Sequence, residues 1–232
     1  MLRQPAAAAR AYNSSRPMIC WSCEKNAGDG MLCAGCGAVQ PPDRTADHFR
    51  VFGLPHRFDL DIADLERRYK EMTKILHPDR FARADDRARR ASLERSVQLN
   101  LAWRTLSQPV ARAEYLLSLE GIEVGESAGR GRSGEVGNRA TQPVDTALLI
   151  EVMDLREALA EARSRGDRAK IATLSADVRA RHDKEMFEVA AGFAAAQPRL
   201  AAIAARMVAA RYLRRFLEEA EADRESEDVT VK

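Results

Sequence analysis

The chain has 232 residues, a formal net charge of +2, 45% apolar residues and 31% charged residues. The balanced charge argues against a dedicated nucleic-acid-binding protein, and no apolar run reaches the roughly 20 residues that a membrane-spanning helix needs. Abundant Ala, Leu, Arg and Glu with few β-branched residues favour an all-α protein.

Residues 1–17 contain arginines, alanines and serines, but no acidic residue and no continuous apolar segment. This composition suits a mitochondrial transit peptide, and it equally suits an upstream extension of a bacterial protein that starts at Met18. The missing apolar segment argues against a secretory signal. We expect a disordered leader outside the fold. Heavy use of Ala and Arg is typical of a GC-rich genome and favours a bacterial cytoplasm. The mitochondrial matrix is the alternative.

All four cysteines lie within residues 18–45, in the pairs Cys20/Cys23 and Cys33/Cys36. Two C-x-x-C pairs can place four thiolates around one metal ion, and a tetrahedral sulfur site suits zinc. Because so small a module buries little core, metal binding would supply its folding energy. Two disulfides, a redox-active pair and an iron–sulfur cluster are the alternatives. Four protein ligands leave no open position, so we expect a structural zinc-knuckle module.

Residues 46–121 show helical spacing on both sides of a polar corner, His77-Pro78-Asp79. Apolar residues recur every three or four positions up to Leu76, behind a suitable N-cap residue, Asp61. Proline removes an amide donor and disfavours helical geometry in the residue before it, so this helix should end at Leu76. A second helical pattern runs out of the corner and stops at Gln108-Pro109.

Two antiparallel helices joined by a loop with His-Pro-Asp resemble a J domain. J domains dock on DnaK-type chaperones and stimulate their ATPase. The resemblance implies that Asp79 bonds to an arginine of the chaperone, that Pro78 keeps the corner rigid and that the basic helix face seats an acidic groove. The chaperone-binding residues implied are His77, Pro78, Asp79, Arg67, Lys70, Lys74 and Arg80.

Residues 122–143 are rich in Gly, Arg and Ser and predict a flexible linker. Residues 144–222 predict a three-helix bundle, with helices over 145–163, over 167–189 and from Pro198 onward, and residues 223–232 predict an acidic tail. The first of these helices has one core stripe: Leu148, Val152, Leu155, Leu159 and Ala162.

A second apolar group on that helix lies away from the core stripe, among acidic residues. It consists of Leu149, Ile150 and Met153, with Asp154, Glu157 and Glu161 nearby. One helix of a three-helix bundle needs only one core stripe, so the second group suggests a partner-binding surface. The alternative is that neighbouring helices bury both faces.

Several runs of the sequence are similar to the HscB family, the J-domain co-chaperones of iron–sulfur cluster assembly. They are Asp47-His48-Phe49 with Phe52-Gly53-Leu54-Pro55, the corner 76–81, and the run 112–121. The cysteine module followed by Gln40-Pro41-Pro42-Asp43 resembles the N-terminal extension of eukaryotic and some bacterial members. Glu24 departs from the pattern, because Gly is expected after the first knuckle. The resemblance implies a scaffold-binding surface made of Leu149, Ile150, Met153, Asp154, Glu157 and Glu161, with Tyr212 from the last helix.

We therefore expect a co-chaperone that binds the iron–sulfur cluster scaffold protein, delivers it to a DnaK/HscA-type chaperone and stimulates that chaperone's ATPase. The sequence has no Gly-rich phosphate loop and no nucleophile beside a base, so we expect no catalytic residues. The alternative is a general J-domain co-chaperone for other clients. A zinc-ribbon nucleic-acid adaptor is a third reading, which the balanced charge disfavours.

Overall fold

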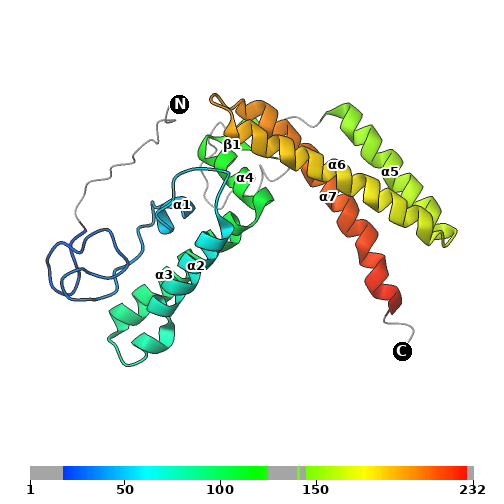
Figure 1. Cartoon of the computed structure of the whole chain (residues 1–232). Coiled ribbons are helices and arrows are strands. Elements are labelled where there is room, and N and C mark those ends of the chain that lie inside the picture. The colour runs from blue at the N-terminus through cyan, green and yellow to red at the C-terminus, as the bar shows by residue number, and fades with distance from the viewer. Residues whose placement is uncertain (1–17, 125–139, 142–144, 229–232) are drawn as a thin grey trace. The chain divides into compact units, whose positions relative to one another are not determined.

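The computed structural model of this chain describes residues 18–124, 140–141 and 145–228. The predicted leader, most of the predicted linker and the end of the predicted acidic tail lie outside the described residues. The described part is mostly helical (Figure 1), which confirms the all-α prediction. None of its helices is both long enough and apolar enough to span a membrane. The chain divides into two compact units, residues up to Arg112 and residues from Ala113 onward.

The first unit begins with the cysteine module, which contains no helix among its described residues. Two short antiparallel bridges, Ile19 with Asn26 and Leu32 with Val39, each close one knuckle. The helices that follow are α1 (His48–Val51), α2 (Ile62–Leu76), the 3-10 turn η1 (Pro78–Phe81) and α3 (Asp86–Ser107). The next helix, α4 (Pro109–Leu119), contains the boundary between the two units.

The hairpin of α2 and α3 forms as predicted, with the two helices side by side in Figure 1. The Asp61 carboxylate accepts hydrogen bonds from the amides of Ala63 and Asp64, which confirms it as the N-cap of α2. The rings of Tyr69 and Trp103 stack with centroids 4.9 Å apart and bring the two helices together.

The C-terminal end of α2 is capped from α3. A helix leaves its last carbonyls without partners in the helix. The Leu76 carbonyl accepts hydrogen bonds from the Ser92 hydroxyl at 2.7 Å and from the Ser96 hydroxyl at 3.4 Å. The corner that follows Leu76 is therefore tied directly to α3.

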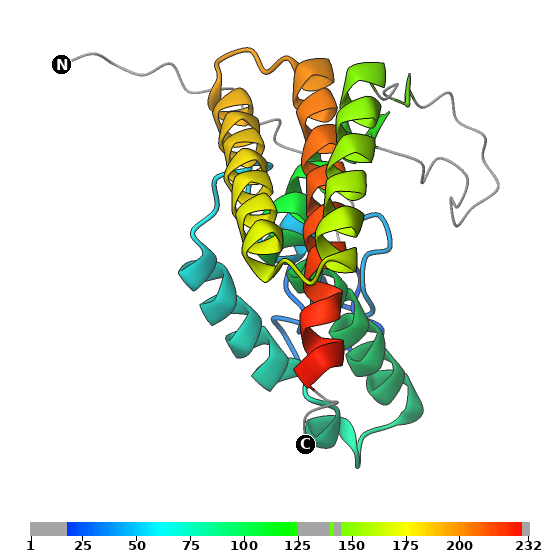
Figure 2. The same cartoon turned by 90° about the vertical axis from the view of Figure 1, so that its right-hand side faces the viewer.

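The second unit contains α5 (Thr146–Ser164), α6 (Arg168–Ala194) and α7 (Leu200–Asp228), which lie side by side in Figure 2. These helices confirm the predicted bundle. Pro198, predicted as the first helical residue, is not helical, because α7 begins at Leu200. The first turn forms when the Ile203 amide bonds to the Arg199 carbonyl, one residue beyond the proline.

The core of the bundle is made by the stripe that the sequence predicts for α5. Leu159 of α5, Val178 of α6 and Leu213 of α7 belong to one buried cluster. One feature was not predicted: β1 (Ile122–Glu123) pairs in parallel with β2 (Ala140–Thr141), so the two ends of the predicted linker meet.

Candidate functional site

The four cysteine sulfurs converge on one point. All four Sγ atoms lie within 4.8 Å of one another, with Cys20 and Cys36 separated by 3.6 Å and Cys23 and Cys33 by 3.8 Å. Metal–sulfur bonds of about 2.3 Å in a tetrahedron give sulfur–sulfur distances of roughly 3.8 Å, so the cluster fits one tetrahedral metal ion. The separations are well beyond the roughly 2.0 Å of a disulfide bond, and all four cysteines are free.

The two knuckles build the site in the same way. The Ser22 amide donates to the Cys20 sulfur at 3.3 Å, and the Gly35 amide donates to the Cys33 sulfur at 3.3 Å. Amide donors aimed at sulfur stabilise a thiolate, which is the form that binds metals. The local turns therefore prepare the first cysteine of each pair as a ligand.

The cluster shares its protons unequally between the thiols. Burial raises the pKa of the Cys20 thiol, but backbone amides and the thiols of Cys36 and Cys33 outweigh it and lower that pKa to about 6. The backbone amide of Lys25 lowers the pKa of Cys23, yet burial and the neighbouring thiols raise it to about 11. Because metal ligands must be deprotonated, metal binding has to displace protons from this cluster.

The residue after each knuckle has a left-handed backbone. Glu24 has φ +60°, and Gly37 at the equivalent place after the second knuckle has φ +73°. Glycine adopts this conformation without strain, whereas a residue with a Cβ atom does not. Glu24, where glycine is expected, therefore increases the backbone strain of the first knuckle and leaves the four cysteine ligands in place.

The His77-Pro78-Asp79 corner is presented to solvent at the end of α2. The side chains of His77 and Asp79 are 53% and 90% exposed, and their Nδ1 and Oδ2 atoms lie 3.5 Å apart. The Asp79 amide donates to His77 Nδ1 at 3.3 Å, and the Arg80 guanidinium donates to the Lys74 carbonyl at 3.3 Å. The predicted corner thus has its own hydrogen bonds and leaves the Asp79 carboxylate open to a partner.

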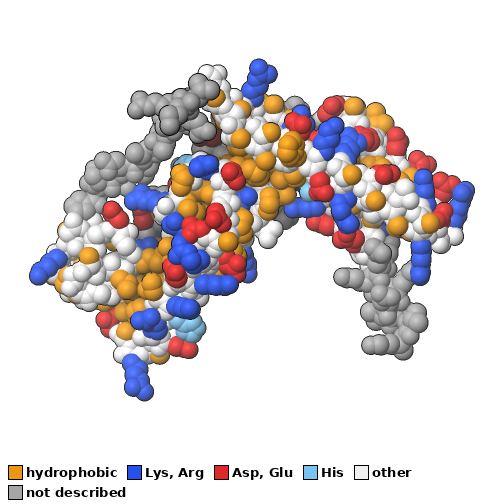
Figure 3. All heavy atoms as spheres, in the orientation of Figure 1, with side chains coloured by type: hydrophobic (Ala, Val, Ile, Leu, Met, Phe, Trp, Pro, Cys, Tyr) orange, Lys and Arg blue, Asp and Glu red, His pale blue; other side chains and the backbone are white. Residues whose placement is uncertain are grey.

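The predicted basic face of α2 is exposed, and acidic residues lie on the same face. Arg67 pairs with Glu71 at 3.1 Å, and Lys70 pairs with Glu66 at 2.6 Å. Figure 3 shows acidic and basic side chains mixed over this part of the surface. Exposed pairs of this kind contribute little stability, so a partner can exchange them at low cost.

The second apolar group of α5 is exposed, so the alternative that neighbouring helices bury both faces is wrong. Leu149, Ile150 and Met153, which we call the apolar strip, are 36%, 55% and 69% exposed. Asp154, Glu157 and Glu161 are exposed beside it. Tyr212 lies half-buried on α7. Binding of a partner by these residues stays a prediction.

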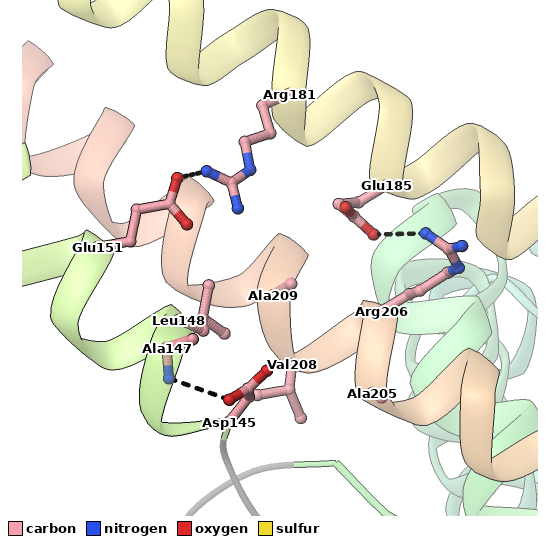
Figure 4. A pocket seen from close by; sticks show the side chains of 10 residues that line it. All are labelled: Asp145, Ala147, Leu148, Glu151, Arg181, Glu185, Ala205, Arg206, Val208 and Ala209. Carbon is pink, nitrogen blue, oxygen red and sulfur yellow. Dashed lines mark hydrogen bonds and ion pairs between the residues drawn. The ribbon is translucent and has the colours of Figure 1, made fainter.

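A pocket of about 320 Å³ lies in the second unit where α5 begins, between α6 and α7 (Figure 4). Arg181 pairs with Glu151, and Arg206 pairs with Glu185 at 3.0 Å. Since both arginines of the lining are paired with glutamates, the pocket reads as a polar seam between helices. No predicted binding residue lines it.

Two residues outside every predicted site support the cysteine cluster. The Gln40 side chain, which is 1% exposed, donates to the Cys20 sulfur at 3.3 Å. Arg95 of α3 donates to the Gln40 main-chain carbonyl at 2.9 Å. Gln40 lies in the run Gln40-Pro41-Pro42-Asp43, which resembles the N-terminal extension of family members, and this resemblance is the sequence signal that could have identified it. Arg95 is one of several arginines on α3, and nothing local distinguishes it.

Comparisons with known proteins agree on one family. Residues 144–221 match the family described as "HSCB C-terminal oligomerisation domain". The chain is 33% identical over 166 residues to "Iron-sulfur cluster co-chaperone protein HscB" of Mus musculus, a match that covers 70% of this chain and 64% of that protein. It is 35% identical to "Co-chaperone protein HscB homolog" of Aromatoleum aromaticum, covering 63% of this chain and 75% of that protein.

The fold leads to the same family. The crystal structure of human co-chaperone protein HscB superposes with a TM-score of 0.75 at 28% sequence identity, and the match covers 89% of this chain and 98% of that one. The chain spans less than two thirds of the length of the mouse protein.

Proposed function

Because this chain belongs to the HscB family of co-chaperones, we propose that it brings the iron–sulfur cluster scaffold protein to a DnaK/HscA-type chaperone and stimulates that chaperone's ATPase. The observation that carries the proposal is the simultaneous exposure of two unlike surfaces. One is the Asp79 corner in the first unit, and the other is the apolar strip in the second. Two binding surfaces on one chain raise the effective concentration of client at the chaperone.

The corner suits docking on a chaperone. The Asp79 carboxylate is 90% exposed, so it can accept charge-assisted hydrogen bonds from an arginine of the partner. His77 and Asp79 lie on an open turn that does not exclude water, which makes the corner a poor site for acid–base catalysis. We therefore propose that the chain activates its partner's ATPase and has no enzymatic activity of its own.

The apolar strip suits a protein client. Exposed large apolar side chains flanked by acids are typical of a binding surface on an otherwise polar helix. Met153, at 69% exposure, is the most exposed member of the strip and the natural anchor for a partner. The acids nearby would select a partner with complementary basic residues.

We propose zinc as the metal of the cysteine cluster. Zinc takes four thiolates in a tetrahedron without redox chemistry, and the sulfur separations of 3.6 and 3.8 Å suit this geometry. With four protein ligands it would be structural: it would hold the two knuckles together.

The test is the ATP turnover of a purified DnaK/HscA-type chaperone with this chain, in the presence and absence of scaffold. We expect stimulation by the wild type and further stimulation when scaffold is added. Asp79→Asn should lose both effects, with its helical circular dichroism unchanged. A variant carrying Leu149→Ala and Met153→Ala should keep the basal stimulation and lose the scaffold-dependent part.

Two outcomes would redirect the proposal. Full stimulation by Asp79→Asn would remove the role of the corner. Stimulation by the wild type that scaffold does not change, with no scaffold bound in a pull-down, would favour the general J-domain co-chaperone for other clients.

A further inference from the structure

The cysteine module rests on one face of α3. The Arg87 guanidinium lies 5.1 Å from the centre of the ring of Trp21. In the sequence, Trp21 stands between the two cysteines of the first knuckle. Arg95 lies two turns further along α3, and Gln98 one turn beyond it. Residues at this spacing share one side of a helix. Three successive contacts therefore join the module to the longer helix of the hairpin.

Arg95 makes the strongest of these contacts. Its Nε donates to the Gln40 carbonyl at 2.9 Å, and its Nη2 donates to the Pro41 carbonyl at 3.0 Å. The Gln98 amide adds a bond to the Asp43 carbonyl at 3.0 Å. The Arg95 side chain is half-buried, and this burial lowers the pKa of its guanidinium. A cation held there without these carbonyls would be poorly solvated.

Gln40 connects this contact with the metal ligands. Its side-chain amide donates to the Cys20 sulfur at 3.3 Å and to the Ala38 carbonyl at 2.8 Å. Both neighbours are acceptors, which fixes the orientation of the amide. The Gln40 Oε1 atom is buried, and none of the described residues gives it a hydrogen-bond partner. An unpaired buried amide oxygen costs free energy, so other interactions must hold the side chain in this orientation. The hydrogen bond that the Gln40 amide donates to the Cys20 sulfur, a metal ligand, is one of them.

We infer that metal binding at the four cysteines and the stability of α3 form one linked equilibrium, transmitted through Cys20, Gln40 and Arg95. With the metal bound, Gln40 stays in place and presents its carbonyl to Arg95. Without the metal, the small module has too little core to hold its turns, and Arg95 loses its acceptors. Linkage is reciprocal: the factor by which metal binding stabilises the ordered state of α3 equals the factor by which ordering of α3 strengthens metal binding. Removing the Arg95 contact should therefore weaken metal binding.

Metal binding would therefore stabilise α3, the helix that also caps the end of α2 before the His77-Pro78-Asp79 corner. Two residues of α3 make these contacts. Arg95 donates to the Gln40 carbonyl, and the Ser92 hydroxyl donates to the Leu76 carbonyl. The two contacts lie within one turn of each other on α3. Loss of the metal should therefore loosen α3 in the segment that positions the end of α2.

The first measurement is the affinity of the full chain for zinc ions, by competition with a colorimetric chelator. We expect Gln40→Leu, which keeps the shape and removes the donor, to bind zinc about tenfold more weakly than the wild type. Arg95→Ala should also weaken zinc binding several-fold, although its side chain touches no sulfur. Arg104→Ala removes an exposed arginine from the same helix and should bind zinc as the wild type does.

The second measurement is amide hydrogen exchange in α3, with zinc and after chelation. Zinc should slow exchange around residues 91–99 in the wild type, and the difference should shrink in Arg95→Ala. Circular dichroism checks that each variant keeps its helices, and Gln98→Ala provides a milder break of the same contact if Arg95→Ala does not fold. The charge-transfer absorption of the cobalt-loaded chain reports whether all four thiolates still bind.

The inference fails if Arg95→Ala binds zinc as tightly as the wild type, or if chelation leaves exchange in α3 unchanged. Weakened zinc binding in Gln40→Leu with no change in α3 would also overturn it, because Gln40 would then serve the metal site alone. None of these outcomes depends on a chaperone or a scaffold protein.

Discussion

The Ser92 hydroxyl, from the second turn of α3, donates a 2.7 Å hydrogen bond to the carbonyl of Leu76, the last residue of α2. Ser92 is 1% exposed, so water cannot take over the bond. Leu76 directly precedes His77. The position of the corner is therefore set by a contact between two residues that are distant in sequence.

Replacing Ser92 by alanine should leave the buried Leu76 carbonyl with only the weaker 3.4 Å bond from Ser96. We expect the free energy of unfolding to fall by about 1–2 kcal/mol in urea denaturation. Ser118→Ala is the matched control, because its exposed hydroxyl bonds within α4, and it should change stability by less than about 0.5 kcal/mol. Equal stability of Ser92→Ala and wild type would mean that Ser96 suffices as the cap.

Replacing Glu24 by glycine should stabilise the cysteine module. The left-handed conformation at φ +60° costs a residue with a Cβ atom about 1–2 kcal/mol, while glycine's freedom in the unfolded chain offsets about 0.5–1 kcal/mol. The net gain should be about 0.5–1 kcal/mol, measured by thermal unfolding of the zinc-loaded chain. Gly37→Ala, at φ +73°, should shift stability in the opposite direction. A loss of stability in Glu24→Gly would contradict the strain at this turn.

Acid should weaken the first unit through Asp43. Hydrogen bonds from the Thr45 hydroxyl and amide, at 2.6 and 2.9 Å, lower the pKa of the Asp43 carboxyl. Its stabilising effect is therefore complete above the unfolded-state pKa of about 3.9, and it is lost as the pH falls through the lower folded-state value. Asp43→Asn should flatten the pH dependence of the unfolding free energy in this window. Asp29→Asn, an exposed control in the same unit, should leave it as it is.

Lys74 should contribute more to chaperone association than Lys70. Lys70 is paired with Glu66 at 2.6 Å, whereas no acidic partner of Lys74 is found among the described residues. A free cation steers an acidic partner better than a neutralised one. Lys74→Glu should lower the association rate constant for the chaperone about tenfold at low salt, and the effect should shrink as salt screens it. Lys170→Glu, on exposed α6 surface, is the charge-matched control, and an equal effect there would show that only net charge matters.

Truncating Met153 should weaken scaffold binding and leave the fold intact. Because the side chain is 69% exposed, Met153→Ala should change the free energy of unfolding by less than about 0.5 kcal/mol. An anchor at the centre of an interface contributes about 1–2 kcal/mol, so the scaffold dissociation constant should rise about tenfold, as isothermal titration calorimetry can measure. Phe187→Ala, at a 72% exposed position of α6, should leave scaffold affinity unchanged. Equal weakening by both variants would place the interface elsewhere.

Local sequence was enough for the helices and for the candidate surfaces. Asp61 predicted the start of α2, and the spacing of Leu148, Val152 and Leu159 predicted which face of α5 is buried. The apolar strip emerged as a second group that the core did not need, and its exposure confirms that reasoning. The prediction that the last helix starts at Pro198 was wrong, because proline can also stand just before a helix begins.

By itself the sequence determined the four-cysteine set, the caps and the helical faces, since capping and helical periodicity join residues only three or four positions apart. Only the tertiary structure decided that Arg95 receives the Gln40 carbonyl and that Ser92 caps Leu76. Such contacts depend on which face of α3 meets the module and which meets α2, and an exposed-looking arginine or serine carries no local mark of its distant partner. The packing of the cysteine module and of α2 against α3 brings these pairs together. The linkage that we infer between metal binding and the hairpin depends on this packing.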